Sequence, residues 1–274
     1  MTPTKKSRRH ALGQHFLASH GVLEKIVRVL DPEPTDRILE IGAGRGELTF
    51  PLAGKADRVV AVEKDERLAG ILKGRAPANV EVVVADVLSL DLRTLAEDRP
   101  GRRAKAVKVV GNLPYAISSP LLFKLIEERA AFDRAVFLVQ REVANRACAK
   151  PGSRDYAPVS ILLDLYFTAA VRFAVHPGSF VPPPKVESAV ISLDARPRPR
   201  YAVADEQAFV RFLHDAFRRR RKTLFNNMTA AGREGGRVEK VFDELGLERT
   251  ARPEQTDAGR FVALFDALRG AEDS

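Results

Sequence analysis

The tetrapeptide Asn112–Tyr115 places a side-chain amide, a rigid proline and an aromatic ring at the end of an apolar run. The run begins at Val107, and a short aliphatic run predicts a buried parallel strand whose carboxyl end meets a ligand. Pro114 fixes its own φ and disfavours helical backbone at Leu113, so carbonyl groups of the turn stay available as acceptors. Ser118 is predicted to cap the following helix. The turn could hold a ligand, although Asn-x-Pro-Tyr is also an ordinary connection between strand and helix.

Two earlier predicted strands also end in residues suited to ligand binding. Residues 37–41 lead into Gly42-Ala43-Gly44, where glycines allow a sharp turn and a close approach of the backbone to a ligand. Residues 59–63 end at Glu63, 21 positions after Gly42, close to the spacing at which an acid binds a ribose diol in nucleotide-binding folds. The glycine pattern G-x-G-x-G differs from the dinucleotide pattern, which argues against NAD and favours a cofactor with one nucleoside and no pyrophosphate.

A third predicted strand, residues 80–84, is followed by Asp86. Its carboxylate could accept a hydrogen bond from an adenine amino group, or it could cap the next turn. Parallel strands bring their carboxyl ends to one edge of a sheet. We therefore expect Glu63, Asp86 and Asn112 to gather beside the glycine turn.

The rest of the chain predicts an α/β domain followed by helices. Strands are predicted at 135–139, 169–175 and 188–193, and helices at 22–30 and 158–167. In the loop before the last strand, prolines hold Phe180 either as a stacking platform or as a core residue. The predicted division is a basic arm and cofactor-covering loop at 1–21, a catalytic domain at 22–196 and a helical domain at 197–274.

Charge and composition narrow the class of partner. The 274-residue chain has a formal net charge of +9, with 45% hydrophobic and 30% charged residues, which describes a globular protein attracted to polyanions. Either basic cluster alone could be a solvated face, but two clusters favour nucleic acid. With no tryptophan, base stacking would depend on Phe or Tyr. The clusters contain Lys5, Lys6, Arg8 and Arg9 near the N-terminus, and Arg218, Arg219, Arg220, Arg221 and Lys222 farther along.

Cysteine content and hydropathy exclude other classes. Cys148 is the only cysteine, so neither an internal disulfide nor a cysteine-built zinc site is expected, and no metal is predicted. No apolar run approaches the roughly 20 residues of a membrane span, and the basic N-terminus lacks an apolar signal segment. A cytoplasmic location is the expectation.

Taken together, the motifs resemble the ribosomal RNA adenine N6,N6-dimethyltransferase family over essentially the whole chain. The resemblance implies a seven-stranded, Rossmann-like S-adenosylmethionine-dependent methyltransferase domain with a small all-helical C-terminal domain. It also implies dimethylation of two adjacent adenosines near the 3′ end of small-subunit rRNA, and we expect a monomer acting on a pre-30S particle. The motifs are residues 13–17, 40–46, 62–63, 85–86, 112–115, 180–190 and 220–224.

The resemblance also implies roles for individual residues. Asn112 and the Leu113 carbonyl would accept hydrogens of the target amine, while Tyr115 and Phe180 would sandwich the base. At position 15 many members carry asparagine where this chain has His15. The implied catalytic residues are Asn112, Leu113, Pro114, Tyr115 and Phe180. The implied cofactor-binding residues are Gln14, His15, Leu17, Gly42, Gly44, Glu63, Asp86 and Asn112. The basic residues proposed to bind RNA are Lys5, Lys6, Arg8, Arg9, Arg219, Arg220, Arg221 and Lys222.

Three alternatives remain. An erythromycin-resistance-type enzyme would share the catalytic domain but modify large-subunit rRNA; Leu113 and the segment 220–224 favour the small subunit. A non-catalytic RNA-binding assembly factor could retain the fold, although the intact set Glu63, Asp86 and Asn112 argues for turnover. A Rossmann oxidoreductase would bind NADH.

Overall fold

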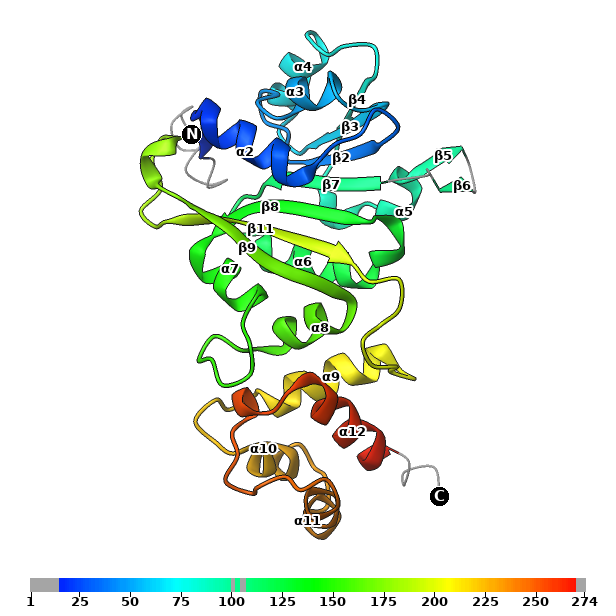
Figure 1. The fold of residues 1–274 in the computed structure, drawn as a ribbon, viewed down its shortest axis with the longest axis vertical. Coiled ribbons are helices and arrows are strands. Elements are labelled where there is room, and N and C mark those ends of the chain that lie inside the picture. The colour runs from blue at the N-terminus through cyan, green and yellow to red at the C-terminus, as the bar shows by residue number, and fades with distance from the viewer. Residues whose placement is uncertain (1–14, 100–101, 104–106, 270–274) are drawn as a thin grey trace, which may run out of the picture. The chain divides into compact units, whose positions relative to one another are not determined.

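The computed structural model describes residues 15–99, 102–103 and 107–269, and its centre is a seven-stranded sheet (Figure 1). The strand order is β4-β3-β2-β7-β8-β11-β9. The first five strands in this order are parallel, and β11 runs antiparallel to β8. The predicted α/β class with seven strands is therefore confirmed. The strands are β2 (Arg37–Ile41), β3 (Arg58–Glu63), β4 (Val80–Val84), β7 (Val107–Asn112), β8 (Arg134–Gln140), β9 (Phe167–Val175) and β11 (Ser188–Ala195).

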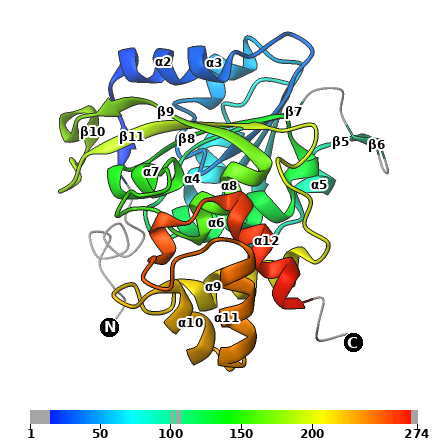
Figure 2. The same cartoon turned by 60° about the horizontal axis from the view of Figure 1, so that its bottom comes forward.

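Helices cover both faces of this sheet because its central strands are aliphatic on both sides. The longer helices are α2 (His20–Leu30), α4 (Glu66–Lys73), α6 (Ser118–Glu127), α8 (Pro158–Tyr166), α9 (Glu206–Ala216), α11 (Gly235–Glu244) and α12 (Ala258–Arg269), and the shorter ones are α3 (Thr49–Ala53), α5 (Leu92–Leu95), α7 (Arg141–Ala147) and α10 (Leu224–Ala230). Helix α2 buries Ile26 and Leu30 in a cluster with Ile38 and Val110 of the sheet. Figure 2 shows α2 and α3 on one side of the sheet and α6 on the other. None of the helices in the described part of the chain is long and apolar enough to cross a membrane.

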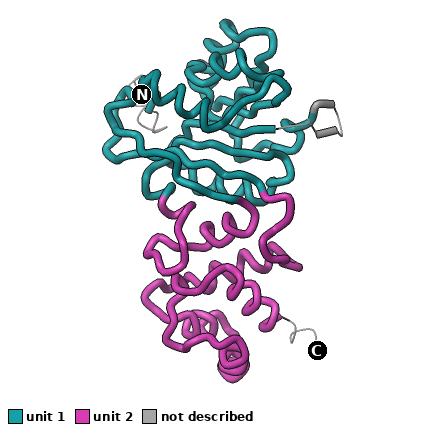
Figure 3. The backbone as a smooth tube through the Cα atoms, viewed as in Figure 1, with its two compact units in different colours: residues 1–144, 168–195 teal, residues 145–167, 196–274 magenta. Residues whose placement is uncertain are grey.

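The chain forms two compact units and crosses between them more often than we expected (Figure 3). The first unit contains residues 1–144 and 168–195, and the second contains 145–167 and 196–274. Residues 145–167 thus group with the C-terminal helices, although the sequence had placed them in the catalytic domain. The reason is that α8 buries seven of its nine residues, and within the second unit it contacts α9 and α12.

Two local predictions differ from the structure. Ser118 is the first residue of α6, and Ile117 is in the capping position, because the turn already closes with an Ile117 N–H to Pro114 carbonyl bond. The Ser118 hydroxyl instead donates to the Pro114 carbonyl at 3.2 Å. The segment expected to be a loop contains the short strand β1 (Phe16–Leu17), which pairs antiparallel with β10 (Phe180–Val181).

Smaller elements complete the described chain. A short antiparallel pair joins β5 (Glu97–Arg99) and β6 (Arg102–Arg103). The 3-10 helices are η1 (Val87–Ser89), η2 (Arg129–Ala131), η3 (Pro177–Ser179) and η4 (Pro253–Gln255).

Candidate cofactor and substrate site

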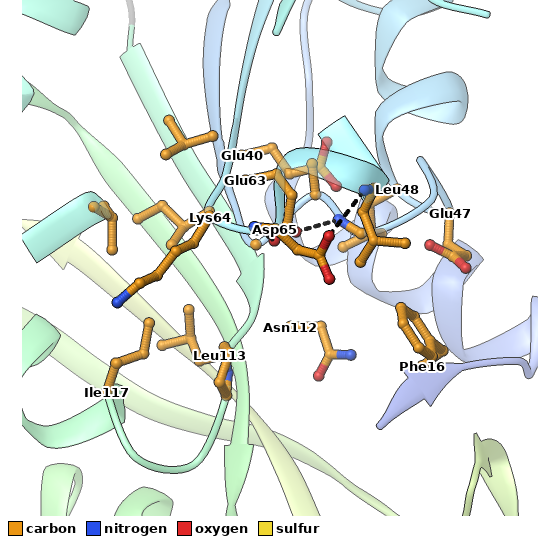
Figure 4. A pocket seen from close by; sticks show the side chains of 18 of the residues that line it. Phe16, Glu40, Glu47, Leu48, Glu63, Lys64, Asp65, Asn112, Leu113 and Ile117 are labelled. Carbon is orange, nitrogen blue, oxygen red and sulfur yellow. Dashed lines mark hydrogen bonds between the residues drawn. The ribbon is translucent and has the colours of Figure 1, made fainter. Parts of the chain in front are cut away.

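The carboxyl ends of four neighbouring parallel strands, β4, β3, β2 and β7, surround a cavity of about 270 Å³. Glu63 and Asn112 face the same space (Figure 4). The register explains this, because Ile41 at the end of β2 pairs with Val62 on one side and with Gly111 on the other. Of the predicted site residues, those that line the cavity are His15, Leu17, Gly42, Gly44, Glu63, Asp86, Asn112, Leu113, Pro114, Tyr115 and Phe180. Gln14 lies outside the described residues.

The glycine turn and Glu63 form one hydrogen-bonded unit. Gly42 and Gly44 have φ values of 73° and 60°, a left-handed backbone that favours glycine. The Gly44 N–H donates to Glu63 Oε2 at 2.8 Å, and the Asp65 N–H donates to Oε1 at 2.8 Å. The Glu63 side chain is therefore held in place from both oxygens, and 8% of the residue is exposed. A ligand at this edge meets a preorganised carboxylate beside an accessible backbone.

Asp86 caps the turn that follows it, as one of its two suggested roles required, and it also lies at the cavity. Its Oδ1 accepts the Leu88 N–H at 3.0 Å, which caps η1. Its Oδ2 accepts a hydrogen bond from Lys64 Nζ at 2.7 Å. The Lys64 hydrogen bond, followed by that of Leu88, holds the pKa of Asp86 below its ordinary value. Lys64 was not predicted, although its place directly after Glu63 was a usable signal.

Asn112 is oriented by a long-range contact. Its side-chain N–H group donates to the His15 carbonyl at 3.0 Å. Because the nitrogen is engaged, the side-chain oxygen is left as the acceptor in a residue that lines the cavity. The His15 ring in turn donates from Nδ1 to the Pro182 carbonyl at 2.8 Å. Its ring centroid lies 5.5 Å from that of Tyr115, with the planes tilted by 31°.

The two predicted stacking rings differ in their surroundings. Tyr115 is half-buried, and its hydroxyl lies 3.3 Å from the Ser188 hydroxyl, within hydrogen-bond distance. Phe180 is 3% exposed and packs in the core cluster with Leu17 and Leu23, yet it also lines the cavity. Phe180 is therefore a core residue whose ring, fixed by packing, also forms part of the cavity wall; its role as a stacking platform stays a prediction.

Glu40 is a site residue that the sequence analysis did not assign. It lines the cavity, and its Oε2 accepts the Thr49 hydroxyl at 2.5 Å. Burial, with 2% of the residue exposed, raises the pKa of Glu40 to about 8, and the nearby carboxylates of Glu47 and Glu63 add to this. An acid flanked by aliphatic residues within strand β2 was the signal that could have identified it.

Comparison with known proteins identifies the family. The profile of the family described as "Ribosomal RNA adenine dimethylase" matches residues 5–269. The chain belongs to this dimethylase family. It is 43% identical over 264 residues to "Ribosomal RNA small subunit methyltransferase A" of Geobacter metallireducens, covering 95% of each protein. The protein of the same name from Geobacter sulfurreducens is 40% identical, covering 97% of each chain.

Solved structures agree with this membership. A dimethyladenosine transferase from Plasmodium falciparum superposes with a TM-score of 0.74 at 27% identity, covering 91% of this chain and 96% of that one. The 23S rRNA methyltransferase ErmE superposes with a TM-score of 0.68 at 26% identity, covering 92% and 99%. The dimethylase fold thus includes both units of the chain.

Dimethylases of this family use S-adenosyl-L-methionine, and the cavity suits it. The ligand carries a nucleoside and a cationic sulfonium. The cavity offers a glycine turn with close backbone approach beside Glu63, and its lining is rich in carboxyl groups. The apolar part of the wall includes Leu17, Leu68 and Val87. The residues present therefore fit the cofactor of the family.

Those predicted RNA-binding residues that the structure describes do not line this cavity. Arg219, Arg220, Arg221 and Lys222 are exposed in the loop between α9 and α10 of the second unit. The buried Asn227 holds this loop, because its side-chain oxygen accepts the Arg219 N–H at 3.1 Å and its nitrogen donates to the Arg219 carbonyl at 3.2 Å. Lys5, Lys6, Arg8 and Arg9 lie outside the described residues.

The single cysteine has the surroundings of a packed residue. Cys148 is partly buried in the second unit, and burial raises the pKa of its thiol to about 11. A thiol with this pKa is almost fully protonated at neutral pH and is a poor nucleophile.

Proposed function

We propose that this protein transfers methyl groups from S-adenosyl-L-methionine to N6 of two adjacent adenosines near the 3′ end of small-subunit rRNA. The observation that carries the proposal is the orientation of the Asn112 side chain. Its nitrogen donates to the His15 carbonyl, so its oxygen is left to accept a hydrogen bond from a substrate amine. Membership of the dimethylase family and the names of the relatives support the same reaction.

The chain's contribution to the reaction is mainly positioning. When bound, the cofactor supplies an electrophilic methyl group on a sulfonium. The exocyclic amine of adenine is a poor nucleophile because its lone pair is delocalised into the ring. We assign Asn112 Oδ1 and the Leu113 carbonyl as acceptors of its two hydrogens, which draws the nitrogen toward pyramidal geometry and aims the lone pair. Alignment of this kind can supply about 7–11 kcal/mol of the barrier.

The same geometry accounts for a second transfer. The amine becomes cationic when it takes up the first methyl group and must release one of its two hydrogens to water as a proton before it can react again. The neutral amide of Asn112 still accepts the remaining hydrogen. An aspartate would retain its negative charge and hold the cationic amine formed in the first transfer more tightly. Asn112→Asp is expected to give monomethyladenosine in preference to dimethyladenosine, measured by mass spectrometry of nucleosides. Equal dimethylation by the variant and the parent would contradict this role of the amide.

The remaining predicted residues take binding roles in this proposal. Glu63 would hold the ribose and Asp86 the adenine of the cofactor, with the Asp86–Lys64 contact opening or shifting as the adenine arrives. Tyr115 and Phe180 would stack on the everted target base, each worth about 1–3 kcal/mol. Movement of the His15 ring relative to Tyr115 would make room for the base.

The chain's charge supports an RNA substrate held within a ribosomal particle. The exposed loop Arg219–Lys222 would contact rRNA backbone, together with the basic residues near the N-terminus. We propose that a monomer acts on a pre-30S particle in the cytoplasm.

Two measurements test the proposal. Small and large ribosomal subunits from cells lacking this protein are incubated with it and methyl-labelled cofactor, and the labelled nucleosides are then identified by mass spectrometry. Dimethyladenosine in small-subunit rRNA is expected, and primer extension locates the two modified positions. Label in large-subunit rRNA would instead support the erythromycin-resistance type of activity. Binding of subunits with no transfer of label would support a non-catalytic assembly factor.

A further inference from the structure

A lysine side chain of the protein joins the ends of β3 and β4 at the cavity. Lys64 directly follows Glu63, the last residue of β3, and Asp86 lies just beyond the end of the neighbouring strand β4. Both Lys64 and Asp86 line the cavity, and Lys64 Nζ lies 2.7 Å from Asp86 Oδ2. The pair therefore lies in the part of the cavity to which the proposed function assigns the adenine of the cofactor.

Both carboxylate oxygens of Asp86 have a hydrogen-bond partner within the chain. Oδ1 accepts the Leu88 N–H at 3.0 Å, and Oδ2 accepts the Lys64 ammonium at 2.7 Å. The Lys64 hydrogen bond is the largest of the causes that hold the pKa of Asp86 below its ordinary value, so the carboxyl group is ionised at neutral pH. The amino group of adenine is also a hydrogen-bond donor. An adenine that reaches Asp86 therefore meets a cationic donor already in contact with the carboxylate.

Of the two partners of Asp86, Lys64 is the one that can leave. The Leu88 N–H belongs to the backbone of η1 and is fixed by that turn. The Lys64 side chain is 65% exposed and has a flexible four-carbon stem, so water can solvate its ammonium group once it has moved away. An ion pair exposed to this degree contributes little free energy, so a ligand with a donor group of its own can displace it.

We propose that Lys64 is an internal competitor of the cofactor, whose ammonium group holds the Asp86 carboxylate until the adenine amino group displaces it. This inference rests on the proposed function, because it uses the assignment of Asp86 to the adenine. It makes Lys64 a residue that sets cofactor affinity without contacting the methyl group that is transferred. Since salt screens an exposed ion pair, the competition weakens as ionic strength rises.

The test measures binding of S-adenosyl-L-homocysteine to the full-length protein by calorimetry. This ligand has the adenosine group of the cofactor but no sulfonium charge. Lys64→Met keeps a side chain of similar length without the ammonium group, and it should bind the ligand about threefold more tightly than the parent at low salt. Raising the salt concentration should bring the affinity of the parent toward that of the variant. Lys64→Arg retains the positive charge and should bind as the parent does.

Two controls separate competition from other effects of the substitution. In an Asp86→Asn background no ion pair can form, so Lys64→Met should no longer tighten binding. An equal gain in that background would mean that methionine only packs better against the adenine, and it would overturn the inference. Arg58→Met removes the exposed ion pair with Glu81, at 2.5 Å, which joins the same two strands at residues that do not line the cavity. This variant should bind as the parent does at every salt concentration.

A ligand without the amino group separates this inference from the proposed function. The purine analogue of S-adenosyl-L-homocysteine lacks the 6-amino group, and the parent should bind it several-fold more weakly than the adenine compound. If the parent discriminates in this way but Lys64→Met has parental affinity, the competition by Lys64 alone is refuted. If the parent binds both ligands equally, the assignment of Asp86 to the adenine is wrong, and the inference fails with it. Methyl transfer by the parent is measured separately and decides the proposed reaction.

Discussion

The buried carboxyl group of Glu40 makes a quantitative prediction about stability and pH. Its pKa is about 8 in the folded protein, against an ordinary value of 4.5. Between these two pH values the unfolded chain has released a proton that the folded protein retains. The free energy of unfolding therefore falls as pH rises from 4.5 to about 8, and the loss is complete above that pH.

The magnitude follows from the size of the pKa difference. At about 1.4 kcal/mol for each pH unit, the free energy of unfolding falls by about 5 kcal/mol between the two pKa values. Glu40→Gln replaces the carboxyl group by an amide that stays neutral and can still accept the Thr49 hydroxyl. The variant should therefore become progressively more stable than the parent as pH rises, by about 3 kcal/mol more at pH 9 than at pH 6.

Urea unfolding of both proteins without cofactor, at intervals from pH 5 to pH 10, measures this difference. Titration of the groups that do not interact with Glu40 cancels when the two profiles are subtracted. A second variant tests the cause. Thr49→Val removes the hydroxyl whose hydrogen bond lowers the pKa of Glu40. The pKa of Glu40 should therefore rise, and the free energy of unfolding should continue to fall to a higher pH than in the parent. A constant difference between Glu40→Gln and the parent across this range would refute the assignment of a protonated, buried carboxyl group.

Three further substitutions test other parts of the structure. Gly111→Ala is expected to cost about 3 kcal/mol of stability in urea unfolding, because the added Cβ would lie 2.5 Å from a backbone oxygen of β2; a near-parental midpoint would contradict the strand packing. In Glu63→Gln, one of the two side-chain oxygens that accept a backbone N–H becomes an NH2 group, so two hydrogen-bond donors face each other. Calorimetry should show at least about tenfold weaker cofactor binding. Asn227→Ala leaves the Arg219 backbone without its side-chain partner, so rRNA binding should weaken several-fold with every basic charge still present. The control Asn226→Ala, at an exposed position, should bind as the parent does, and equal affinities of both variants would show that the loop needs no such support.

The sequence alone determined the fold class and the convergence of polar residues. Each of the strands that ends at Glu63, near Asp86 or at Asn112 is a local aliphatic run, and such runs are readable without knowledge of distant residues. Because parallel strands share an edge for their carboxyl ends, the order of these runs was enough to predict that the three residues meet. The ordered motifs were also sufficient to indicate the family.

Only the tertiary structure decided how these groups are paired and charged. The contact of Asn112 with the His15 carbonyl joins residues 97 positions apart, and no local pattern contains it. The pKa of Glu40 depends on burial by elements from elsewhere in the chain, and the association of α8 with the C-terminal helices depends on which apolar surfaces meet. Local chemistry specifies which residues reach the edge of the sheet, whereas hydrogen-bond partners and desolvation are properties of the folded environment.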